Sequence, residues 1–210
     1  MASSIVRLCR RLRYGAPVVV VSGLPRSGTS MLMKMLEAGG LSVVTDGLRT
    51  ADEDNPKGYY EVERIKDLAR ETDTAYLRDA RGKVVKVISF LLRYLPGDLN
   101  YRVVFIRRSV EEVLASQKKM LARRGEADDT PAERMRELAE TDLWRAGYLL
   151  RHAPQFEVID VQYADFLAHP QEWARRLNQF LGGKLDVEAM AGVVDPALYR
   201  NRAVGRQAAR

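Results

Sequence analysis

Cysteine and histidine are scarce in this chain, and their scarcity limits the chemistry that it can carry. Among 210 residues there is one cysteine, Cys9, and there are two histidines, His152 and His169. One cysteine excludes a disulfide within the chain and is typical of proteins that work in a reducing compartment. One thiol and two widely separated imidazoles also provide no cluster of metal ligands. We therefore expect neither a disulfide framework nor a metal site.

Long apolar runs are also missing, so the sequence offers no segment of the length that crosses a membrane. Residues 5–13 are basic and lack the apolar core of a signal peptide. We expect residues 1–16 to be a basic lead with a frayed, solvated end, and a weak contact with a membrane surface is the alternative. Residues 204–210 are expected to be a short basic tail. Together these features predict a cytoplasmic protein.

Acidic residues are outnumbered by basic ones, 28 to 34, and the formal net charge is +6. This balance suits nucleic acid, a membrane surface or an acidic ligand. The basic residues are interleaved with acids and form no RNA-binding signature, so we expect no nucleic-acid partner. A hydrophobic share of 46% and a charged share of 30% are typical of a globular domain. We expect one domain over residues 17–203, with a few arginines committed to a polyanionic ligand.

Residues 18–32, VVVVSGLPRSGTSML, form the most informative stretch of the sequence. Four consecutive valines predict a short buried strand, and the glycine-containing run after them predicts a tight loop. Leu32, Met35 and Leu36 then follow a helical period, which Gly39 ends. A helix that begins after such a loop presents backbone N–H groups and positive potential to an anion. The stretch therefore predicts a phosphate site.

The loop departs from the Walker A pattern G-x-x-x-x-G-K-[ST] at its lysine. Gly23, Gly28 and Ser30 occupy the two glycine positions and the hydroxyl position, but Thr29 stands in place of the lysine. Arg26 is the only cation in the loop. The side chain that reaches the β- and γ-phosphates of a nucleoside triphosphate is therefore missing. The pattern favours a ligand with a terminal 5′-phosphate group over hydrolysis of a nucleoside triphosphate.

Four further segments are predicted to be strands, and none of the predicted strands ends in an aspartate that would hold a hydrated magnesium ion. They are residues 41–44, 83–88, 102–106 and 156–161. The third of them is followed by Arg107 and Arg108, which suit a second phosphate group. Helices between the strands, including 110–123 and 132–151, favour a parallel sheet with helices on both faces. We expect a single-domain α/β fold of the P-loop type, with three layers and about five parallel strands.

Residues 24–30, LPRSGTS, resemble the 5′-phosphosulfate loop of sulfotransferases, especially the P-R-S-G-T-[ST] form of the tyrosylprotein and bacterial members. Residues 55–61, NPKGYYE, resemble a second motif of the bacterial members, and residues 162–170 resemble the family's Y-E-D-L-L-x-x-P segment. Sulfotransferases move a sulfuryl group from PAPS (3′-phosphoadenosine 5′-phosphosulfate) to a hydroxyl or amine. The resemblance implies this activity, with PAPS as the cofactor, adenosine 3′,5′-bisphosphate as the product, and no metal ion.

The resemblance also implies which residues bind PAPS. In the family, the 3′-phosphate site uses an arginine and a serine eight residues later, and Arg108 and Ser116 have this spacing. A tyrosine near the adenine corresponds to Tyr163, for which a purely structural role is the alternative. The family's C-terminal R-K-G segment is missing, and Arg200 or Arg202 would replace it unless the basic tail is disordered. The expected PAPS-binding residues are Pro25, Arg26, Ser27, Gly28, Thr29, Ser30, Arg108, Ser116, Tyr163, Arg200 and Arg202.

The identity of the catalytic base is open in the sequence. In the cytosolic members, a K-T-H run supplies the histidine that deprotonates the acceptor, whereas this chain has lysine, valine and isoleucine at residues 86–88. We expect Arg26 and Lys86 to stabilise negative charge during transfer. Glu61, which ends the second motif, is the expected base. The alternative carboxylates are Asp46, Asp52 and Asp54.

The acceptor is expected to be a small molecule, a glycan or a peptide. Two other functions fit parts of the sequence. A small-molecule or nucleoside kinase would need an ATP site that this loop is poorly equipped to make. A non-catalytic nucleotide-binding protein would explain the missing histidine as a loss of chemistry.

Overall fold

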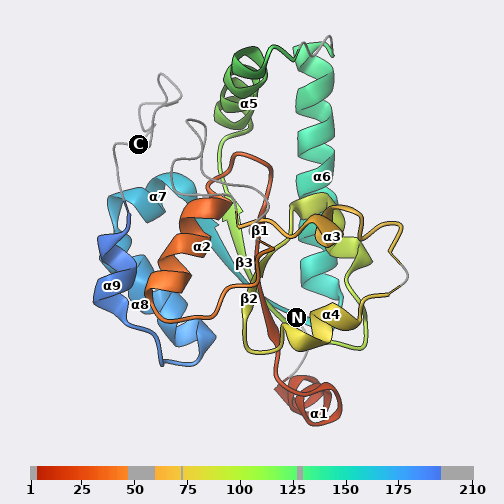
Figure 1. Cartoon of the computed structure of the whole chain (residues 1–210), viewed down its shortest axis with the longest axis vertical. Helices are drawn as coiled ribbons and strands as arrows, with labels where there is room; N and C mark the ends of the chain where they lie inside the picture. The colour runs from red at the N-terminus through yellow and green to blue at the C-terminus, as the bar shows by residue number, and fades with distance from the viewer. Residues whose placement is uncertain (1–3, 47–59, 72, 127–129, 195–210) are drawn as a thin grey trace, which may run out of the picture.

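Four parallel strands form the sheet in the computed structural model, which describes residues 4–46, 60–71, 73–126 and 130–194 (Figure 1). The strands are β1 (Val18–Gly23), β2 (Val84–Lys86), β3 (Tyr101–Arg107) and β4 (Phe156–Gln162). Their order is β2-β1-β3-β4, and Val20 of β1 lies opposite Val85 and Val103 of its two neighbours. Because β1 is a central strand, all six of its residues are buried, in agreement with the run of valines.

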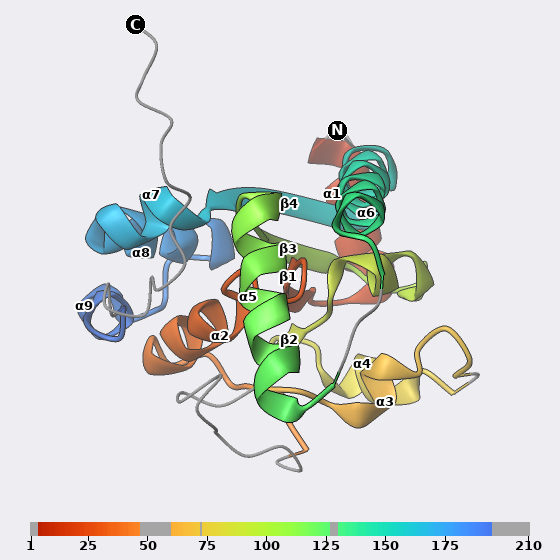
Figure 2. The same cartoon turned by 90° about the horizontal axis from the view of Figure 1, so that it is seen from above.

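Helices cover both faces of the sheet, which gives the three layers expected from the sequence (Figure 2). On one face lie α2 (Thr29–Ala38), α7 (Tyr163–Ala168), α8 (Pro170–Leu181) and α9 (Val187–Gly192). They bury Val19 and Val21 of β1 in one core. On the other face lie α3 (Glu63–Lys66), α4 (Ala75–Asp79), the 3₁₀ helix η1 (Ser89–Tyr94) and α6 (Ala132–His152), which bury Val18 and Val20. Successive valines therefore serve opposite cores.

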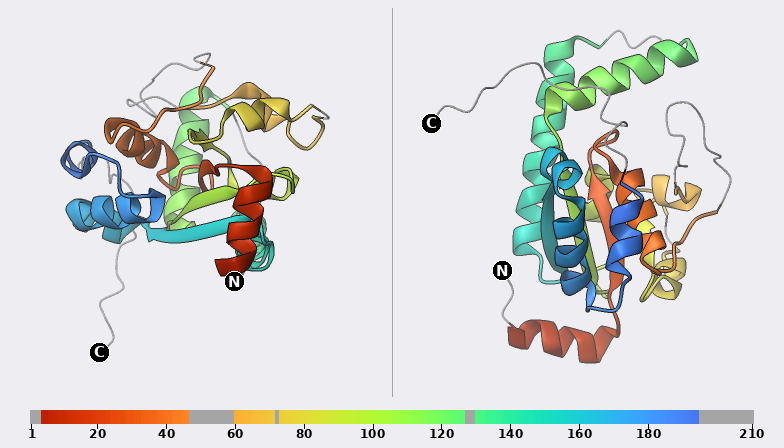
Figure 3. Two further views of the ribbon diagram at one scale, coloured as in Figure 1. Left: turned by 90° about the horizontal axis from the view of Figure 1, so that it is seen from below. Right: turned by 90° about the vertical axis from the view of Figure 1, so that its left-hand side faces the viewer.

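Two helices lie beyond the two ends of the sheet. α5 (Val110–Arg124) begins after the carboxyl end of β3, crosses above the strand ends and meets α6 (Figures 1 and 2). α1 (Ser4–Tyr14) lies across the opposite end of the molecule (Figure 3). Of the helices that the structure describes, none combines the length and apolar composition that a membrane span requires. The fold is thus the predicted single-domain, P-loop-type α/β fold.

The expectation of about five strands is wrong by one. Residues 41–44 form no strand, and Val43 makes only an isolated parallel bridge to Val84. Directly after this bridge the chain turns to the segment before α3, where the hydroxyl of Thr45 donates to the carbonyl oxygen of Glu61 at 3.2 Å. The segment is therefore too short to form a ladder, although its direction is the one that a fifth parallel strand would have.

The expectation of a frayed, solvated end is wrong for residues 4–14, because they form α1, which is anchored to the turn before β3. The guanidinium of Arg10 donates to the carbonyl oxygens of Gly97 and Leu99 at 2.8 and 2.9 Å, and to Oδ1 of Asn100 at 3.2 Å. Asn100 returns a hydrogen bond to the carbonyl oxygen of Arg10 at 3.1 Å. These partners lie far away in the sequence, so local composition does not reveal them. The division of the chain into lead, domain and tail stays a prediction.

Candidate active site

The end of β1 and the loop that follows it approach their neighbours so closely that two residues, Gly23 and Gly28, must be glycine. At Gly28, where φ is 107°, a Cβ atom would lie 2.6 Å from the ring of Tyr163. At Gly23, a Cβ atom would lie 2.6 Å from the carbonyl oxygen of Ile106 on β3. Gly28 is also the N-cap of α2, and it has no side chain that could occupy the N–H groups of the first turn. The loop and the start of α2 thus form a cradle suited to a phosphate group.

Arg26 is held in a strained backbone conformation within this loop. Its φ of 69° lies in the left-handed region, which costs a non-glycine residue about 1–2 kcal/mol. Ser27 fixes the turn, since its N–H and its hydroxyl both donate to the carbonyl oxygen of Leu24, at 3.1 and 2.6 Å. The Nε of Arg26 donates to Oγ of Ser116 on α5 at 3.3 Å. A strained arginine with an anchored side chain suggests that its guanidinium is functional.

Arg108, which follows β3, supports the loop from behind. Its Nη1 donates to the carbonyl oxygen of Arg26 at 3.2 Å, and its Nε donates to Glu112 at 2.9 Å. The side chains of Arg108 and Glu112 are each only 7% exposed. The guanidinium of Arg108 also lies 4.4 Å from the centre of the Tyr163 ring, and burial raises the pKa of that tyrosine. Residues that the sequence predicts for both phosphates and for the adenine of PAPS are therefore neighbours, with Ser116 beside them.

Lys86, the last residue of β2, brings a second cation to the start of α2. Its Nζ lies 3.4 Å from Oγ of Ser30 and 3.2 Å from Oε1 of Glu61. The other carboxylate oxygen of Glu61 lies 3.1 Å from Nζ of Lys66. Glu61 thus lies beside the predicted site, but both of its oxygens contact lysines. This arrangement favours a role in holding Lys86, and the role of Glu61 as the base stays a prediction.

A mainly apolar pocket of about 450 Å³ adjoins the other side of the loop. It lies between Leu24 and Pro25 of the loop, η1, α5 and α6. Among its described lining residues, the only carboxylate is that of Asp142 on α6, which accepts a hydrogen bond from the hydroxyl of Ser89. Burial raises the pKa of Asp142, while the hydrogen bond from Ser89 and the charges of two nearby arginines offset part of the increase. The pocket therefore holds a carboxylate whose proton affinity is higher than usual, next to the phosphate cradle.

Sequence reasoning did not place Asp142 at the site. The available signal was a carboxylate that interrupts the apolar positions of a long amphipathic helix. Such an interruption is usually only a solvated position. In the structure Asp142 faces η1 and the pocket, because α6 packs on η1. That contact joins residues 53 positions apart, and no local pattern predicts it.

Replacing Asp142 by asparagine is expected to stabilise the protein near neutral pH. Folding raises the pKa of this carboxyl above its ordinary value of 3.8, so its contribution to stability is lost as the pH rises through the folded-state pKa. Asparagine keeps an oxygen for Ser89 and does not ionise. We expect the thermal midpoint to rise by about 2 °C near pH 8, and the difference to vanish below about pH 4. Scanning fluorimetry across this pH range measures it, and a variant that is less stable at every pH contradicts it.

The other predicted residues are placed as follows. Thr29 and Ser30 are the first two residues of α2. Asp46 accepts a hydrogen bond from the N–H of Glu63 at 2.6 Å and so binds the backbone at the start of α3. Four residues lie outside the described part of the chain, and their roles stay predictions: Asp52, Asp54, Arg200 and Arg202.

A buried strand, a glycine loop and a helix N-terminus with cationic side chains around them define an α/β protein of the P-loop type. The particular family follows from the sequence itself. Residues 70–186 match the model of the Sulfotransferase family, so the chain belongs to the sulfotransferase family. The matched segment contains Arg108, Ser116, Asp142 and Tyr163, and it begins after the phosphate loop. No curated protein sequence matches the chain.

Solved sulfotransferase structures share the fold. The sulfotransferase domain of the olefin synthase of Synechococcus PCC 7002 has a TM-score of 0.55 and 19% identity, with 92% of this chain and 90% of that domain covered. A sulfotransferase from Alicyclobacillus acidocaldarius has a TM-score of 0.50 and 17% identity over 81% of this chain and 84% of that one. The sulfotransferase domain from the curacin biosynthetic pathway also has a TM-score of 0.50, at 13% identity, and covers 92% of this chain and 94% of its own. At these identities the likeness concerns the fold.

Proposed function

We propose that this protein transfers a sulfuryl group from PAPS to a hydroxyl or amine of a small-molecule, glycan or peptide acceptor, without a metal ion. The observation that carries the proposal is the meeting of Arg26, Ser116 and Arg108 around the glycine cradle at the start of α2. Two guanidiniums and a helix N-terminus supply positive charge for two phosphate groups. Membership of the sulfotransferase family supports the reaction type.

The residues around the cradle fit the charged groups of PAPS. The N–H of Ser27 binds within the loop, so we assign the 5′-phosphate to the N–H groups of residues 28–30 and to the side chain of Arg26. Arg108 and Ser116 would hold the 3′-phosphate, and Tyr163 would contact the adenine. PAPS supplies the activated sulfuryl group when it is bound. Arg26 and Lys86 then place positive charge where the leaving phosphate oxygen gains negative charge, which is the main contribution that the protein has to make.

The pocket beside Pro25 suits the body of an acceptor with apolar surface. One of its walls belongs to the phosphate loop, so an acceptor that fills it would lie next to the transferred group. Ser89 and Asp142 form its polar end. Ser89 directly follows Ile88, which is where the resemblance to the cytosolic enzymes would place their histidine. Asp142 is therefore a second candidate for the base, beside the Glu61 that the sequence predicts.

A kinase is the alternative function. Comparing how far different nucleotides stabilise the protein distinguishes it from a sulfotransferase. Adenosine 3′,5′-bisphosphate is expected to stabilise the protein, whereas AMP, which leaves the 3′ site empty, and ATP with Mg²⁺ should do so far less. At a hundredfold excess of ligand over its dissociation constant, linkage gives about 2.7 kcal/mol. This corresponds to a rise of about 5–10 °C in the thermal midpoint for a chain of this size. Equal shifts from AMP and from the bisphosphate contradict the assignment of a 3′-phosphate site.

The variant Arg108→Lys tests the assignment of the 3′-phosphate. It keeps a positive charge behind the loop but loses the planar guanidinium. Calorimetric titration should show affinity for the bisphosphate falling by about 10- to 150-fold in Arg108→Lys, the equivalent of a charged hydrogen bond, while affinity for AMP changes little. An equal loss of affinity for AMP and for the bisphosphate would indicate that Arg108 supports the loop and does not bind the 3′-phosphate.

A further inference from the structure

The apolar side of α1 is largely exposed, although Leu8 at its edge also lines a pocket beneath the helix. Ile5, Leu8 and Leu12 are 74%, 60% and 80% exposed, which is the reverse of the usual burial of such side chains. They are spaced by three and four residues, so they share one face of the helix. The face is continuous along the eleven residues of α1, and it has no cover among the residues that the structure describes.

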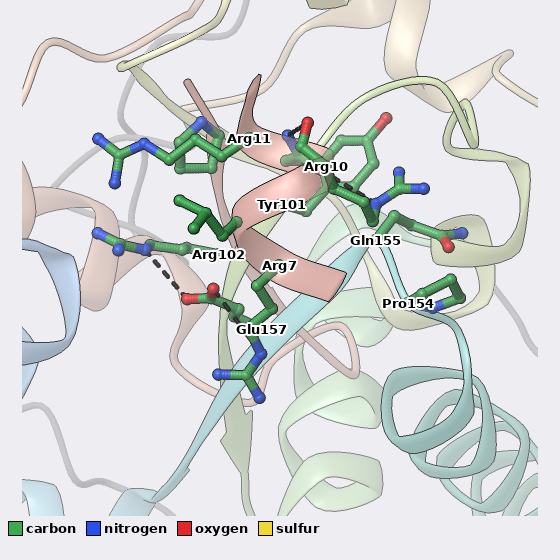
Figure 4. A pocket seen from close by; sticks show the side chains of 11 residues that line it. Arg7, Arg10, Arg11, Tyr101, Arg102, Pro154, Gln155 and Glu157 are labelled. Carbon is green, nitrogen blue, oxygen red and sulfur yellow. Dashed lines mark hydrogen bonds and ion pairs between the residues drawn. The ribbon is translucent and has the colours of Figure 1, made fainter. Parts of the chain in front are cut away.

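Polar contacts fix this orientation. The inner face of α1 carries Arg7 and Arg10, both partly buried, and Arg10 donates three hydrogen bonds to the turn before β3. Arg7 lies 4.0 Å from Glu157 of β4. Figure 4 shows these arginines pointing between α1 and the sheet, where they line a pocket of about 240 Å³. The helix therefore cannot turn its apolar face inward without losing its anchors.

Positive charge borders the apolar face on both sides. α1 contains four arginines and no acidic residue. At 100° per residue, Arg11 and Arg13 lie on opposite edges of the apolar face, and both are exposed. Among the described contacts, only Arg7 of the four lies within 4.0 Å of a carboxylate oxygen. An apolar stripe with arginine edges on a helix of low net hydrophobicity is typical of helices that lie in the interface of a membrane.

The position of α1 suits such a contact. The helix lies across the end of the molecule that is opposite to α5 and the carboxyl ends of the strands (Figures 1 and 3). A flat surface could approach it there without meeting another helix, and the phosphate loop would remain at the far end. We propose that α1 docks this protein onto membranes with anionic lipid headgroups. This proposal is independent of the reaction proposed above.

Charge and size favour a lipid surface over a second copy of the chain. A stable protein interface buries about 800 Å² on each partner, far more than three aliphatic side chains supply. Two copies facing each other through α1 would also bring together eight arginines, twice the four of one helix. An anionic bilayer suits both the small apolar area and the arginines. It takes up short stretches of aliphatic side chains, and each arginine near its surface raises the partition coefficient by about fivefold.

The test is flotation of the full chain with vesicles. Vesicles of phosphatidylcholine mixed with phosphatidylserine should retain the protein at low salt, at least about tenfold more than pure phosphatidylcholine. Raising the salt concentration should release it. The double variant Leu8→Glu with Leu12→Glu should lose this retention by at least about tenfold, and Arg11→Gln with Arg13→Gln should lose most of it.

The matched control carries the same kind of change at Trp144 and Tyr148, two exposed apolar residues of α6. Trp144→Glu with Tyr148→Glu should bind vesicles like the parent. Circular dichroism and thermal midpoints show whether each variant is folded. No retention on the phosphatidylserine vesicles overturns the proposal, and so does equal loss in the α1 and α6 variants. Dimerisation in light scattering that the α1 variant abolishes, without vesicle binding, overturns it in favour of a second copy.

Discussion

An Arg26→Ala variant is expected to keep its fold and to lose turnover by about 10²- to 10³-fold, the cost of removing one preorganised donor from a site of developing charge. Arg26 is the cation of the loop itself, and Ser116 fixes its side chain at 3.3 Å. Lys86 is a poor substitute, because its ammonium is shared between Ser30 and Glu61 and lacks the planar fork of a guanidinium. The measurement is the release of adenosine 3′,5′-bisphosphate from PAPS in the presence of an acceptor found by screening.

Two further substitutions at Arg26 separate the side chain from the backbone. Arg26→Gly removes the same guanidinium and relieves the left-handed strain, so it should be as inactive as Arg26→Ala but more stable by about 1 kcal/mol. Arg26→Lys keeps the charge and should fall between the parent and the alanine variant. Parental turnover in Arg26→Gly would show that the guanidinium takes no part in transfer.

The centre of the fold could be predicted because its signals are local. Four valines in succession predict a strand that is covered on both faces, and β1 is that strand. The glycines after it predict a tight loop, and a Cβ atom at either Gly23 or Gly28 would indeed collide with a neighbouring chain segment. Arg107 and Arg108, which follow the predicted strand 102–106, likewise predict a cationic strand end. In each case the pattern that signals the feature lies within a few positions, although the neighbours that Gly23 and Gly28 approach, Ile106 and Tyr163, are distant in the sequence.

The features that the sequence did not reveal depend on contacts between distant segments. α1 is anchored because Arg10 reaches residues about ninety positions away, whereas the sequence analysis expects a frayed end. The segment around Val43 reaches the sheet edge but is drawn off by the backbone of Glu61. Asp142 becomes part of a pocket only through Ser89 on η1. Patterns of hydrophobicity describe which face of an element is apolar, but not which element will meet it.

The difference between local sequence signals and contacts of distant segments matters most for the identity of the catalytic base. The sequence predicts Glu61, while the pocket favours Asp142. We expect Asp142→Asn to lower turnover by about 10²- to 10⁴-fold, the usual contribution of a positioned base, without changing affinity for adenosine 3′,5′-bisphosphate. Asp142 lies in the pocket, and its raised pKa makes it a stronger proton acceptor than an ordinary aspartate. Glu61→Gln should instead weaken the hold on Lys86 and cost less.

The pH dependence of kcat/KM distinguishes the two carboxylates independently of the size of the loss. A base must be ionised to act, so the parent enzyme should gain activity as the pH rises through the raised pKa of Asp142. Glu61→Gln should keep this acid limb. Ser89→Ala should move the limb to higher pH, because the hydrogen bond from Ser89 stabilises the ionised carboxylate and lowers its pKa. Asp142→Asn should remove the limb. If Glu61→Gln removes it and Asp142→Asn leaves it in place, Glu61 is the base and Asp142 only shapes the pocket.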